Sequence, residues 1–333
     1  MGRFPLQRLL GALVTLGLAT GAAACDVDVT HSPPTPTSKP AVTATTVPTT
    51  QAPPSQTATE ALFTASPATA TLTPSPTPEP TLTPTATPTS TPLPTPDADA
   101  RNRAVRLPIL MYHYVEPWPV NAGEIRKSLT VQPENFAAQI RYLHDHGYVT
   151  VSLYDLLYAL TLGWPLPPKA VVITFDDGYR DLMQYAAPVM QPYGYTGTVF
   201  VITELMDREF ERYLTWPQAE SLYAQGWKIE PHTKTHDQLA GQSRDFQLYQ
   251  MLGSMQTIAA HTGVMPRFFD YPSGKYDDMT LQLDHELGLW GAVTVKFGRA
   301  HTLDSLYTLT RVRVSGQDTL RQFVDLLEGD LQP

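Results

Sequence analysis

Two short motifs hold most of the residues in this sequence that could do chemistry. The first is Thr174–Gly178 (TFDDG), in which Asp176 and Asp177 directly follow the apolar, β-branched run 170–175. Adjacent carboxylates at the end of a buried strand are costly unless their charge is neutralised, and a divalent metal ion would neutralise it. Asp-Asp-Gly is also a common turn sequence, so this motif alone predicts either a metal-binding strand end or a simple turn.

The second motif, His232–His236 (HTKTH), places two histidines four residues apart. This spacing predicts that both imidazoles lie on one side of a helical turn. With one carboxylate they would form a ligand set that leaves positions on a bound metal open for water and substrate. Neither motif alone is specific for a metal site. If both lie at the ends of different strands in one domain, however, they predict the same metal site.

The elements around these motifs alternate between strands and helices. Continuous apolar runs predict buried parallel strands, and apolar residues three or four positions apart predict helices. The predicted strands are 107–114, 148–152, 170–175, 196–202, 228–230, 268–271 and 291–295, and the predicted helices are 133–147, 153–162, 185–193, 216–225, 246–262, 281–287 and 319–327. This order predicts an α/β fold, a distorted or incomplete (β/α) barrel, whose chemistry collects at the carboxyl ends of the strands. The polar residues at such ends are His113, Asp176, Asp177, His232 and Asp270.

The two motifs together resemble those of the polysaccharide deacetylases, the NodB-homology family of carbohydrate esterases (family 4). Phe268–Gly274 (FFDYPSG) and Leu110–His113 (LMYH) extend the resemblance, which covers about residues 106–315. The sequence LMYH resembles that of the family branch that deacetylates the biofilm polymer poly-N-acetylglucosamine. In that branch the order of the barrel elements along the chain is permuted. The resemblance implies a NodB-like domain and a hydrolase that removes N-acetyl groups from a polysaccharide.

The resemblance also implies roles for single residues. Asp177, His232 and His236 match the family's metal ligands, for which zinc is the usual metal although other divalent ions occur. Asp176 matches its catalytic base. The implied reaction is attack of a metal-activated water on the N-acetyl carbonyl, after which a general acid protonates the sugar amine and acetate departs.

The sequence departs from the family pattern in its third motif. Asp270 stands where many members have an Arg that contacts the catalytic base. An extra carboxylate there would tend to raise the pKa of Asp176. Arg267 lies three residues earlier and could compensate, but a strand would place it on the opposite face from Asp270.

The family's Leu-His motif near the C-terminus is also missing, since the matching text is 309–314 (LTRVRV). We therefore expect His113, at the end of the first predicted strand, to act as the general acid, with a structural histidine as the alternative. The predicted substrate-binding residues are Tyr271, Pro272, Asp270 and Trp290. For the aromatic residues among them, plain core packing is the alternative.

The first 24 residues have the layout of a secretory signal, with Arg3 and Arg8 before an uncharged apolar run that ends in three alanines. Cys25 follows directly and is the only Cys in the chain. This arrangement resembles a bacterial lipoprotein signal and implies lipidation of Cys25. An ordinary signal peptide or an uncleaved anchor are the alternatives, although the run is short for a membrane-spanning helix.

Residues 25–104 are predicted to be a disordered Thr/Pro-rich linker. The stretch 31–100 holds 17 Pro and 21 Thr, which cannot bury enough apolar surface to offset the entropy of ordering. The deacetylase domain would then occupy 105–333. These predictions describe an extracytoplasmic domain that a flexible tether and a lipid anchor hold at the cell membrane.

The charge of the chain limits its partners. The net charge is −9, and the 20 Lys and Arg against 26 Asp and Glu that follow residue 100 leave the domain mildly acidic. Because there is no basic block, we expect no nucleic-acid partner. We expect a monomer acting on an N-acetylated exopolysaccharide or peptidoglycan. The alternatives are a carbohydrate-binding pseudoenzyme of the same fold and an O-acetyl esterase.

Overall fold

The computed structural model describes residues 92–329. The predicted signal peptide, Cys25 and most of the predicted linker lie outside the described residues. Residues 97–103, which we assigned to the linker, are instead part of the folded domain. The backbone N–H of Asp97 donates to the carbonyl of Thr161, and Ala100 is buried. The ordered domain therefore begins several residues before the predicted boundary at 105.

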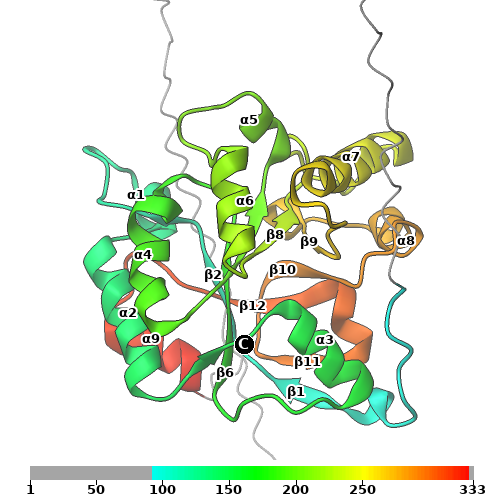
Figure 1. The fold of residues 1–333 in the computed structure, drawn as a ribbon, viewed down its shortest axis with the longest axis horizontal. Helices are drawn as coiled ribbons and strands as arrows, with labels where there is room; N and C mark the ends of the chain where they lie inside the picture. The colour runs from blue at the N-terminus through cyan, green and yellow to red at the C-terminus, as the bar shows by residue number, and fades with distance from the viewer. Residues whose placement is uncertain (1–91, 330–333) are drawn as a thin grey trace, which may run out of the picture. The chain divides into compact units, whose positions relative to one another are not determined.

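A parallel sheet forms the centre of this domain (Figure 1). Its strand order is β8-β7-β6-β2-β12-β10-β9, and β5 pairs with one end of β6. The strands are β2 (Ile109–Tyr112), β5 (Val149–Thr150), β6 (Ala170–Phe175), β7 (Thr198–Val201), β8 (Lys228–Pro231), β9 (Phe268–Asp270), β10 (Gly291–Phe297) and β12 (Leu309–Arg313). The sheet curls into a nearly closed barrel, which confirms the predicted distorted (β/α) barrel.

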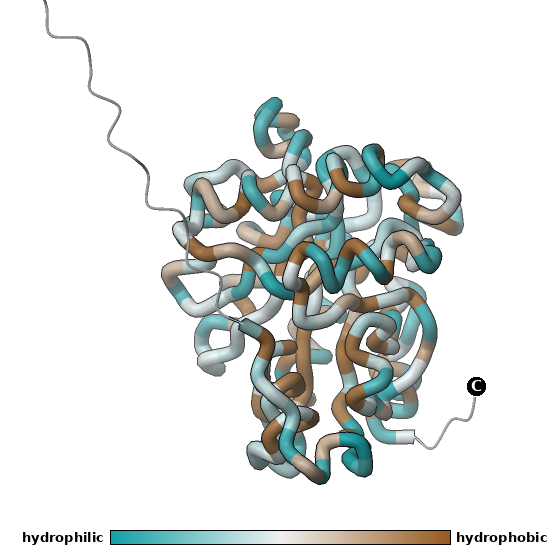
Figure 2. The backbone as a smooth tube through the Cα atoms, turned by 90° about the vertical axis from the view of Figure 1, so that its right-hand side faces the viewer, coloured by the Kyte–Doolittle hydropathy of each residue, from teal (hydrophilic) through white to brown (hydrophobic). Residues whose placement is uncertain are grey.

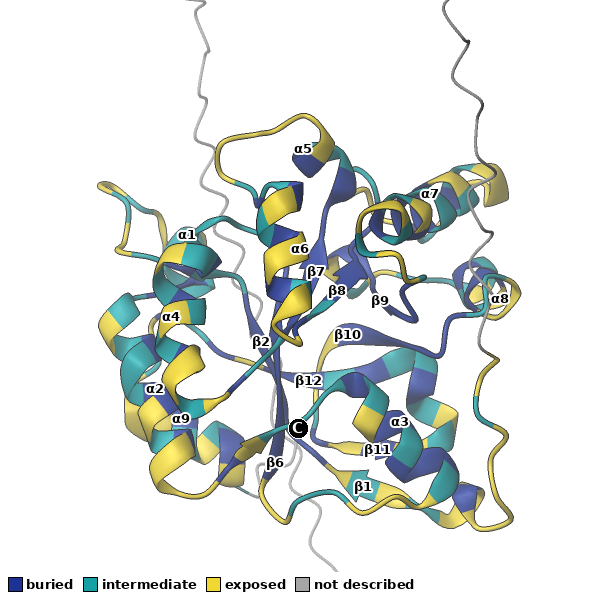
Figure 3. Cartoon of the chain, viewed as in Figure 1, coloured by how far each residue is buried: buried dark blue, intermediate teal, exposed yellow. Residues whose placement is uncertain are grey.

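Helices cover the outside of the barrel, with exposed residues on their outer sides and buried residues toward the sheet (Figure 3). They are α1 (Glu124–Leu129), α2 (Pro133–Asp145), α3 (Leu153–Leu162), α4 (Ala187–Met190), α5 (Thr203–Asp207), α6 (Trp216–Ala224), α7 (Arg244–Thr262), α8 (Asp278–Glu286) and α9 (Leu320–Glu328). Short helical turns are η1 (Ala100–Asn102), η2 (Leu182–Ala186), η3 (Gln191–Tyr193), η4 (Pro272–Gly274) and η5 (Leu303–Thr308). Within the described part of the chain, no helix is long and apolar enough to span a bilayer.

Two small pairings lie beside the main sheet. β1 (Ala104–Arg106) runs antiparallel to β11 (Ala300–Thr302), and β3 (Tyr114–Val115) runs parallel to β4 (Thr130–Val131). The sequence patterns did not predict these short strands, nor α1, α5 and β12. The predicted helix 185–193 is in fact three consecutive short pieces, the π-helical turn η2 followed by α4 and η3.

Local sequence signals explain where the main elements begin and end. All six residues of β6 are buried, as expected for a central parallel strand covered on both faces. Helix α3 begins at a capping box, in which Ser152 and Asp155 satisfy each other's backbone N–H groups. It ends at Gly163, which has a φ of 67° that glycine adopts without strain. Apolar stretches run through the middle of the domain, and polar segments lie mostly at its periphery (Figure 2).

Side chains bridge the gap between β8 and β9, the two ends of the described sheet. The buried carboxylate of Glu230 accepts the backbone N–H groups of Arg267 and Phe268 at 3.0 and 2.9 Å. Tyr154 donates its hydroxyl to the other oxygen of Glu230 at 2.7 Å. The side chain of Glu230 thus replaces backbone hydrogen bonds between β8 and β9. It holds the start of β9 against β8.

Candidate functional site

The carboxyl ends of the barrel strands surround a pocket of about 420 Å³. Its lining includes the predicted residues His113, Asp176, Asp177, His232, His236, Asp270 and Tyr271, together with Met111, Leu129, Tyr179, Ser273, Val295, Arg311 and Arg313. Asp176 and Asp177 follow the last residue of β6, and His232 follows the last residue of β8. The structure therefore brings both sequence motifs to one cavity, as the strand-end rule requires.

Asp177, His232 and His236 form a cluster suited to a metal ion. One ligand atom from each residue lies within 4.8 Å of the others. Asp177 Oδ1 is 3.4 Å from Nε2 of His232 and 3.3 Å from Nε2 of His236, and it is buried without a hydrogen-bond partner. A buried carboxylate oxygen facing two imidazole nitrogens fits a divalent cation, because two imidazoles and one carboxylate are a common ligand set for zinc.

The charge of these groups also favours a cation. Burial acts to raise the pKa of Asp177, but the neighbouring imidazoles of His232 and His236 hold it well below its usual value. Burial acts to lower the pKa of His232, but the carboxylates of Asp270 and Asp177 raise it to about 9. Asp177 is thus held ionised, which is the form in which a carboxylate can act as a metal ligand.

The two histidines do not share a helical turn, so that prediction was wrong. Residues 232–236 form a loop after β8, in which Thr233 and His236 have φ values of 64° and 68°. Asp177 has a φ of 69°, also in the left-handed region that non-glycine residues rarely adopt. Strained backbone of this kind collects at functional sites, and here it turns both ligand-bearing segments toward the pocket.

Hydrogen bonds fix the orientation of the loop and its histidines. His232 Nδ1 lies 2.8 Å from the backbone carbonyl of Asp270, which leaves Nε2 directed at Asp177. Gln250 on α7 is buried, and its Oε1 accepts the backbone N–H groups of Lys234 and Thr235 at 3.0 and 3.1 Å. Partners of this kind set the ring orientation of metal-binding histidines. No sequence motif pointed to Gln250.

Asp176 faces Arg311, a residue on β12 that the sequence patterns did not single out. Arg311 Nη1 and Nη2 donate to the two carboxylate oxygens of Asp176 at 2.6 and 2.9 Å, and Nη2 also donates to Asp270 Oδ1 at 3.0 Å. Its Nε donates to the carbonyl of Thr294 at 2.9 Å. All three residues of this ion-pair cluster are buried.

Arg311 corrects two expectations about the third motif. We expected Asp270 to raise the pKa of Asp176, but Arg311 holds the pKa of Asp176 below its usual value although burial acts to raise it. Burial instead raises the pKa of Asp270 to about 7. Arg267, the compensating residue considered from the sequence, donates to the carbonyl of Gly288 and lies over the ring of Trp290. The guanidinium beside the base therefore comes from a different strand.

His113 also lies close to Asp176. Its Nε2 is 3.9 Å from Asp176 Oδ2, and it lines the pocket immediately after β2. Burial lowers the pKa of His113, although Asp176 and Asp177 act to raise it. The structure thus places a titratable imidazole in the same pocket as Asp176, and its role as general acid stays a prediction.

The four predicted substrate-binding residues differ in where the structure places their side chains. Tyr271 lines the pocket, with its hydroxyl tied to Asp284 and to the carbonyl of Tyr307. Asp270 also lines the pocket, but its side chain is fully buried against Arg311 and His232, so its carboxylate holds these two residues. Pro272 and Trp290 are buried but do not line this pocket.

Trp290 belongs to the core instead, which corrects its assignment. It packs edge-to-face on Tyr154 at 5.7 Å between ring centroids, in the apolar cluster that also contains Leu157 and Phe268. Trp290 lies immediately before β10, at the opposite end from the carboxyl end of the strand where the pocket opens. Core packing, the alternative for this aromatic residue, is what the geometry shows.

The arrangement combines three capabilities in one cavity. It can hold a cation at three ligand atoms, it keeps one carboxylate ionised beside them, and it presents an imidazole across from that carboxylate. This combination suits hydrolysis in which a water molecule is activated and the leaving group is protonated.

Comparison with known proteins places this arrangement in a family. The polysaccharide deacetylase family profile matches residues 164–292, which include both motifs. The putative polysaccharide deacetylase YxkH of Bacillus subtilis is 34% identical over 213 residues, which are 64% of this chain and 73% of the relative. This chain belongs to the polysaccharide deacetylase family. The family's enzymes are hydrolases, and the resemblance inferred from TFDDG and HTKTH is confirmed.

Other members of the family are similar to this chain in sequence, over alignments of different length. A poly-β-1,6-N-acetyl-D-glucosamine N-deacetylase of Staphylococcus aureus is 26% identical over 218 residues, 61% of this chain and 73% of that protein. The Escherichia coli protein of the same name is 27% identical over 134 residues, and this chain covers only 20% of its length.

Solved structures of deacetylases have the same fold. Streptococcus pyogenes deacetylase PplD in complex with acetate superposes with a TM-score of 0.63 at 28% identity, covering 68% of this chain and all of that one. IcaB from Ammonifex degensii superposes with a TM-score of 0.58 at 25% identity, covering 67% of this chain and 97% of that one. The NodB-like architecture of the domain is therefore shared with these deacetylases.

Proposed function

We propose that this protein is a metal-dependent N-deacetylase that acts on an extracellular polysaccharide containing N-acetylglucosamine and releases acetate. The observation that carries the proposal is the cluster of Asp177, His232 and His236 beside the Arg311-held Asp176. Relatives in S. aureus and E. coli are poly-β-1,6-N-acetyl-D-glucosamine N-deacetylases, which favours an exopolysaccharide of that type over peptidoglycan.

Each residue of the pocket has a part in the proposed reaction. A divalent cation held by Asp177, His232 and His236, with zinc as the first candidate, would polarise the acetamide carbonyl and acidify the attacking water. Asp176 accepts the proton of that water, and the ion pair with Arg311 keeps Asp176 ionised for this task. His113 donates a proton to the amine as the bond to the acetyl carbon breaks.

The argument for the pseudoenzyme alternative is Asp270, which replaces the Arg that many family members place beside the base. In this structure Arg311 supplies a guanidinium to Asp176, and Asp270 serves to hold that guanidinium and to orient His232. The substitution is thus compatible with turnover. The O-acetyl esterase alternative is a matter of substrate, because the same groups can attack an ester.

The proposal is tested by acetate release from the purified chain supplied with Zn²⁺ and oligomers of N-acetylglucosamine. We expect release from N-acetylated oligomers, and loss of release in Asp176→Asn with zinc content retained. His232→Ala should lose zinc itself. Sugar binding without any release would support the pseudoenzyme, and release from O-acetylated sugars alone would support the esterase.

The cellular location is part of the proposal and depends on the N-terminal sequence. A signal of 24 residues, lipidation of Cys25 and the Thr/Pro-rich linker would hold a monomeric domain outside the cytoplasmic membrane. Membrane fractionation of cells expressing the chain, with Cys25→Ser as the comparison, tests this. We expect Cys25→Ser to move the protein from the membrane fraction to the soluble fraction.

A further inference from the structure

Within the described residues, several aspartates have a buried carboxyl oxygen without a hydrogen-bond partner. They are Asp177, Asp181, Asp270 and Asp284. Asp177 belongs to the proposed metal site, and Asp270 belongs to the ion-pair cluster with Arg311. Asp181 and Asp284 have no part in the proposed reaction, and the sequence patterns singled out neither. Buried polar atoms in folded proteins are normally paired, so each exception has a physical cause.

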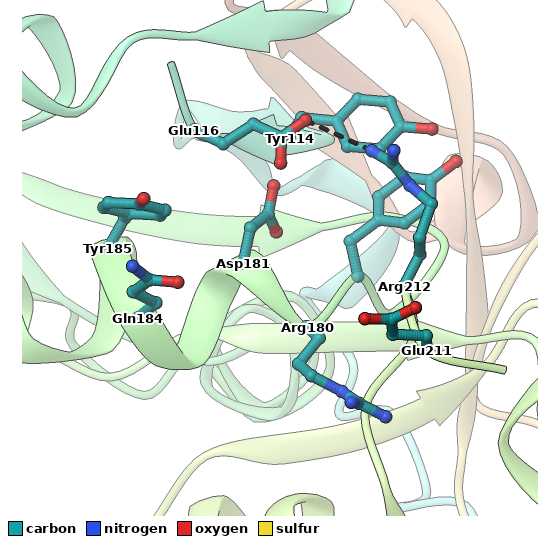
Figure 4. Close-up of a pocket in the computed structure, with 9 residues that line it drawn as sticks. Tyr114, Glu116, Arg180, Asp181, Gln184, Tyr185, Glu211 and Arg212 are labelled. Atoms are coloured by element: carbon teal, nitrogen blue, oxygen red, sulfur yellow. Dashed lines mark hydrogen bonds and ion pairs between the residues drawn. The ribbon is translucent and has the colours of Figure 1, made fainter. Parts of the chain in front are cut away.

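Asp181 lies beside open space. It lines a cavity of about 510 Å³, and its carboxylate points toward Glu116 on the opposite wall (Figure 4). Its Oδ2 accepts the backbone N–H of Val115 at 3.0 Å. A cavity with polar walls and this volume is large enough for water, which can bind the second oxygen. The cavity therefore explains Asp181 without a further role.

Asp284, on α8, is fully buried and lies against an apolar region. Its Oδ2 contacts the hydroxyl of Tyr271, and its Oδ1 has no partner. Tyr271 belongs to an apolar cluster that also contains Met251, Phe269 and Leu283. Within the described part of the chain, no Lys, Arg or His forms an ion pair with Asp284. Burial thus acts on this carboxyl without a compensating positive charge.

The hydroxyl of Tyr271 has one proton but contacts two oxygens. Besides Asp284 Oδ2, it lies 3.0 Å from the backbone carbonyl of Tyr307 on η5. Burial raises the pKa of Tyr271 well above its usual value, so the hydroxyl stays protonated. A carbonyl oxygen cannot donate in return. Both contacts become hydrogen bonds when Asp284 carries a proton and donates it to the phenol oxygen.

A proton on Asp284 also removes the cost of burying its charge. An ionised carboxylate that has one hydroxyl partner and no cation is costly inside a protein, whereas a neutral carboxyl group is not. The pKa of Asp284 agrees with this argument. Burial raises it to about 7, although the hydrogen bond with Tyr271 acts to lower it.

The other titratable side chains around this contact have partners of their own or face solvent. The paired groups are Tyr276 with Lys296, Arg244 with Glu286, His285 with the ring of Tyr307, and Arg267 with the carbonyl of Gly288. The exposed acids are Asp278 on α8 and Asp304 on η5. Helix α7 contributes the neutral amide of Gln247, which accepts the hydroxyl of Thr280. The protonation of Asp284 therefore depends on burial and on Tyr271.

Tyr271 connects Asp284 to the reaction site. It lines the catalytic pocket and directly follows Asp270. The carbonyl of Asp270 lies 2.8 Å from Nδ1 of His232, and its carboxylate accepts a hydrogen bond from Arg311. Fixing the hydroxyl of Tyr271 therefore helps to fix the residue that orients a proposed zinc ligand and the guanidinium beside the base.

We propose that Asp284 is a positioning residue of this active site. Its carboxyl group is a neutral acid that donates from Oδ2 to the hydroxyl of Tyr271, and Tyr271 donates to the carbonyl of Tyr307. The positioning role rests on the proposed deacetylase function and adds a residue to it. Asp284 does not line the catalytic pocket, so it acts through Tyr271.

Infrared spectroscopy of the purified full chain tests where the proton lies. The C=O stretch of a protonated carboxyl group is separate from the amide and carboxylate bands. We expect the difference spectrum between wild type and Asp284→Asn at pH 5.5 to contain this band, and the band to weaken by pH 8.5. A difference spectrum that shows a carboxylate band at pH 5.5 would overturn the neutral acid.

The pH dependence of unfolding gives a second measure of the same proton. Because the folded pKa is raised, the folded chain binds this proton more tightly than the unfolded chain does. Wild type should therefore lose stability relative to Asp284→Asn as the pH rises from about 4 to about 7, and the difference should stay constant above that range. Urea unfolding measures the difference, and a constant difference across the range would contradict the proposal.

Zinc affinity tests the positioning role without turnover. Asp284→Ala leaves Tyr271 without its partner, so we expect zinc affinity to fall about tenfold, as for other residues that support metal ligands indirectly. Asp284→Asn can donate from its amide and should restore the affinity. Tyr271→Phe should lower the affinity as Asp284→Ala does, which gives a second variant if Asp284→Ala does not fold. Asp278→Ala, exposed on the same helix, is the control.

The outcomes separate this inference from the proposed function. Wild-type zinc affinity in both Asp284→Ala and Tyr271→Phe would overturn the positioning role, and so would an equal loss in Asp284→Asn and Asp284→Ala. If wild type releases no acetate from any N-acetylated oligomer, the deacetylase function fails. The infrared band and the zinc affinities still decide in that case whether a neutral Asp284 supports the metal site.

Discussion

Arg311 and Asp176 face each other through two N–H···O contacts of 2.6 and 2.9 Å, although 135 residues separate them in the sequence. Paired contacts of this geometry are specific to arginine, because its planar guanidinium matches the two oxygens of a carboxylate. The remaining nitrogen, Nε, is held by the carbonyl of Thr294. The pair thus fixes both the charge and the orientation of the proposed base.

Arg311→Lys keeps the positive charge but loses the paired contact. We expect kcat to fall by about 10²-fold, since a misplaced catalytic group costs rates of that order. Zinc content should stay at the wild-type level, because Arg311 contacts no proposed ligand atom. Steady-state acetate release and metal analysis measure the two quantities. Arg321→Lys, on the exposed side of α9, is the control, and wild-type turnover in Arg311→Lys would contradict the orienting role.

Gln250→Ala removes the side chain that accepts the N–H groups of Lys234 and Thr235. The loop between His232 and His236 should then be less well positioned, and zinc affinity should fall by about 10 to 100-fold. Competition with a chromogenic chelator measures this affinity. Gln256→Ala, an exposed position on the same helix, should bind zinc as wild type does. Equal affinity in the two variants would show that Gln250 does not support the site.

His113→Gln tests the proposed general acid. The amide keeps hydrogen-bonding capacity but cannot transfer a proton, so we expect kcat to fall by about 10² to 10⁴-fold. Zinc binding should be retained, because His113 is not among the three clustered ligands. His144→Gln, at an exposed position on α2, is the control. Full activity of His113→Gln would leave His113 as a structural residue.

Asp277 caps α8 and contributes stability that depends on pH. Its Oδ1 accepts the N–H of Thr280 at 3.0 Å, and its Oδ2 accepts the N–H of Gly241 at 2.7 Å. Although burial acts to raise the pKa of Asp277, these N–H groups lower it from 3.8 to about 2. Because the folded pKa is lowered, this stability is present above about pH 4 and is lost as the pH falls toward 2.

Asp277→Ala should therefore lower the free energy of unfolding at pH 7 by about 1 kcal/mol, the usual cost of losing a helix cap. Urea unfolding at pH 7 and at pH 3 measures the effect, and the difference from wild type should shrink at the lower pH. Asp278→Ala, exposed in the first turn of the same helix, is the control. A difference that stays constant with pH would contradict the capping role of the carboxylate.

The patterns of the sequence identified the alternation of strands and helices because buried parallel strands and amphipathic helices have distinct periods. They missed β12, which contains Arg311 at its third position. Arg311 belongs to no motif, since Thr310 and Arg313 in the same strand are also polar, and its direction depends on the register of β12 against β2. Only the curled sheet shows that its side chain enters the centre of the site.

The sequence by itself determined that the residues within each motif lie together, because neighbouring residues at the end of one strand stay close in any fold. The residue types in Thr174–Gly178 and His232–His236 indicated a metal site, and the family resemblance implied its ligands, although the helical turn predicted for the two histidines was wrong. Tertiary structure decided which groups surround that cluster, because Arg311 and Gln250 come from elements far along the chain. It also decided that Trp290 packs in the core, since the contacts of a residue just before a strand depend on which other elements pack around it.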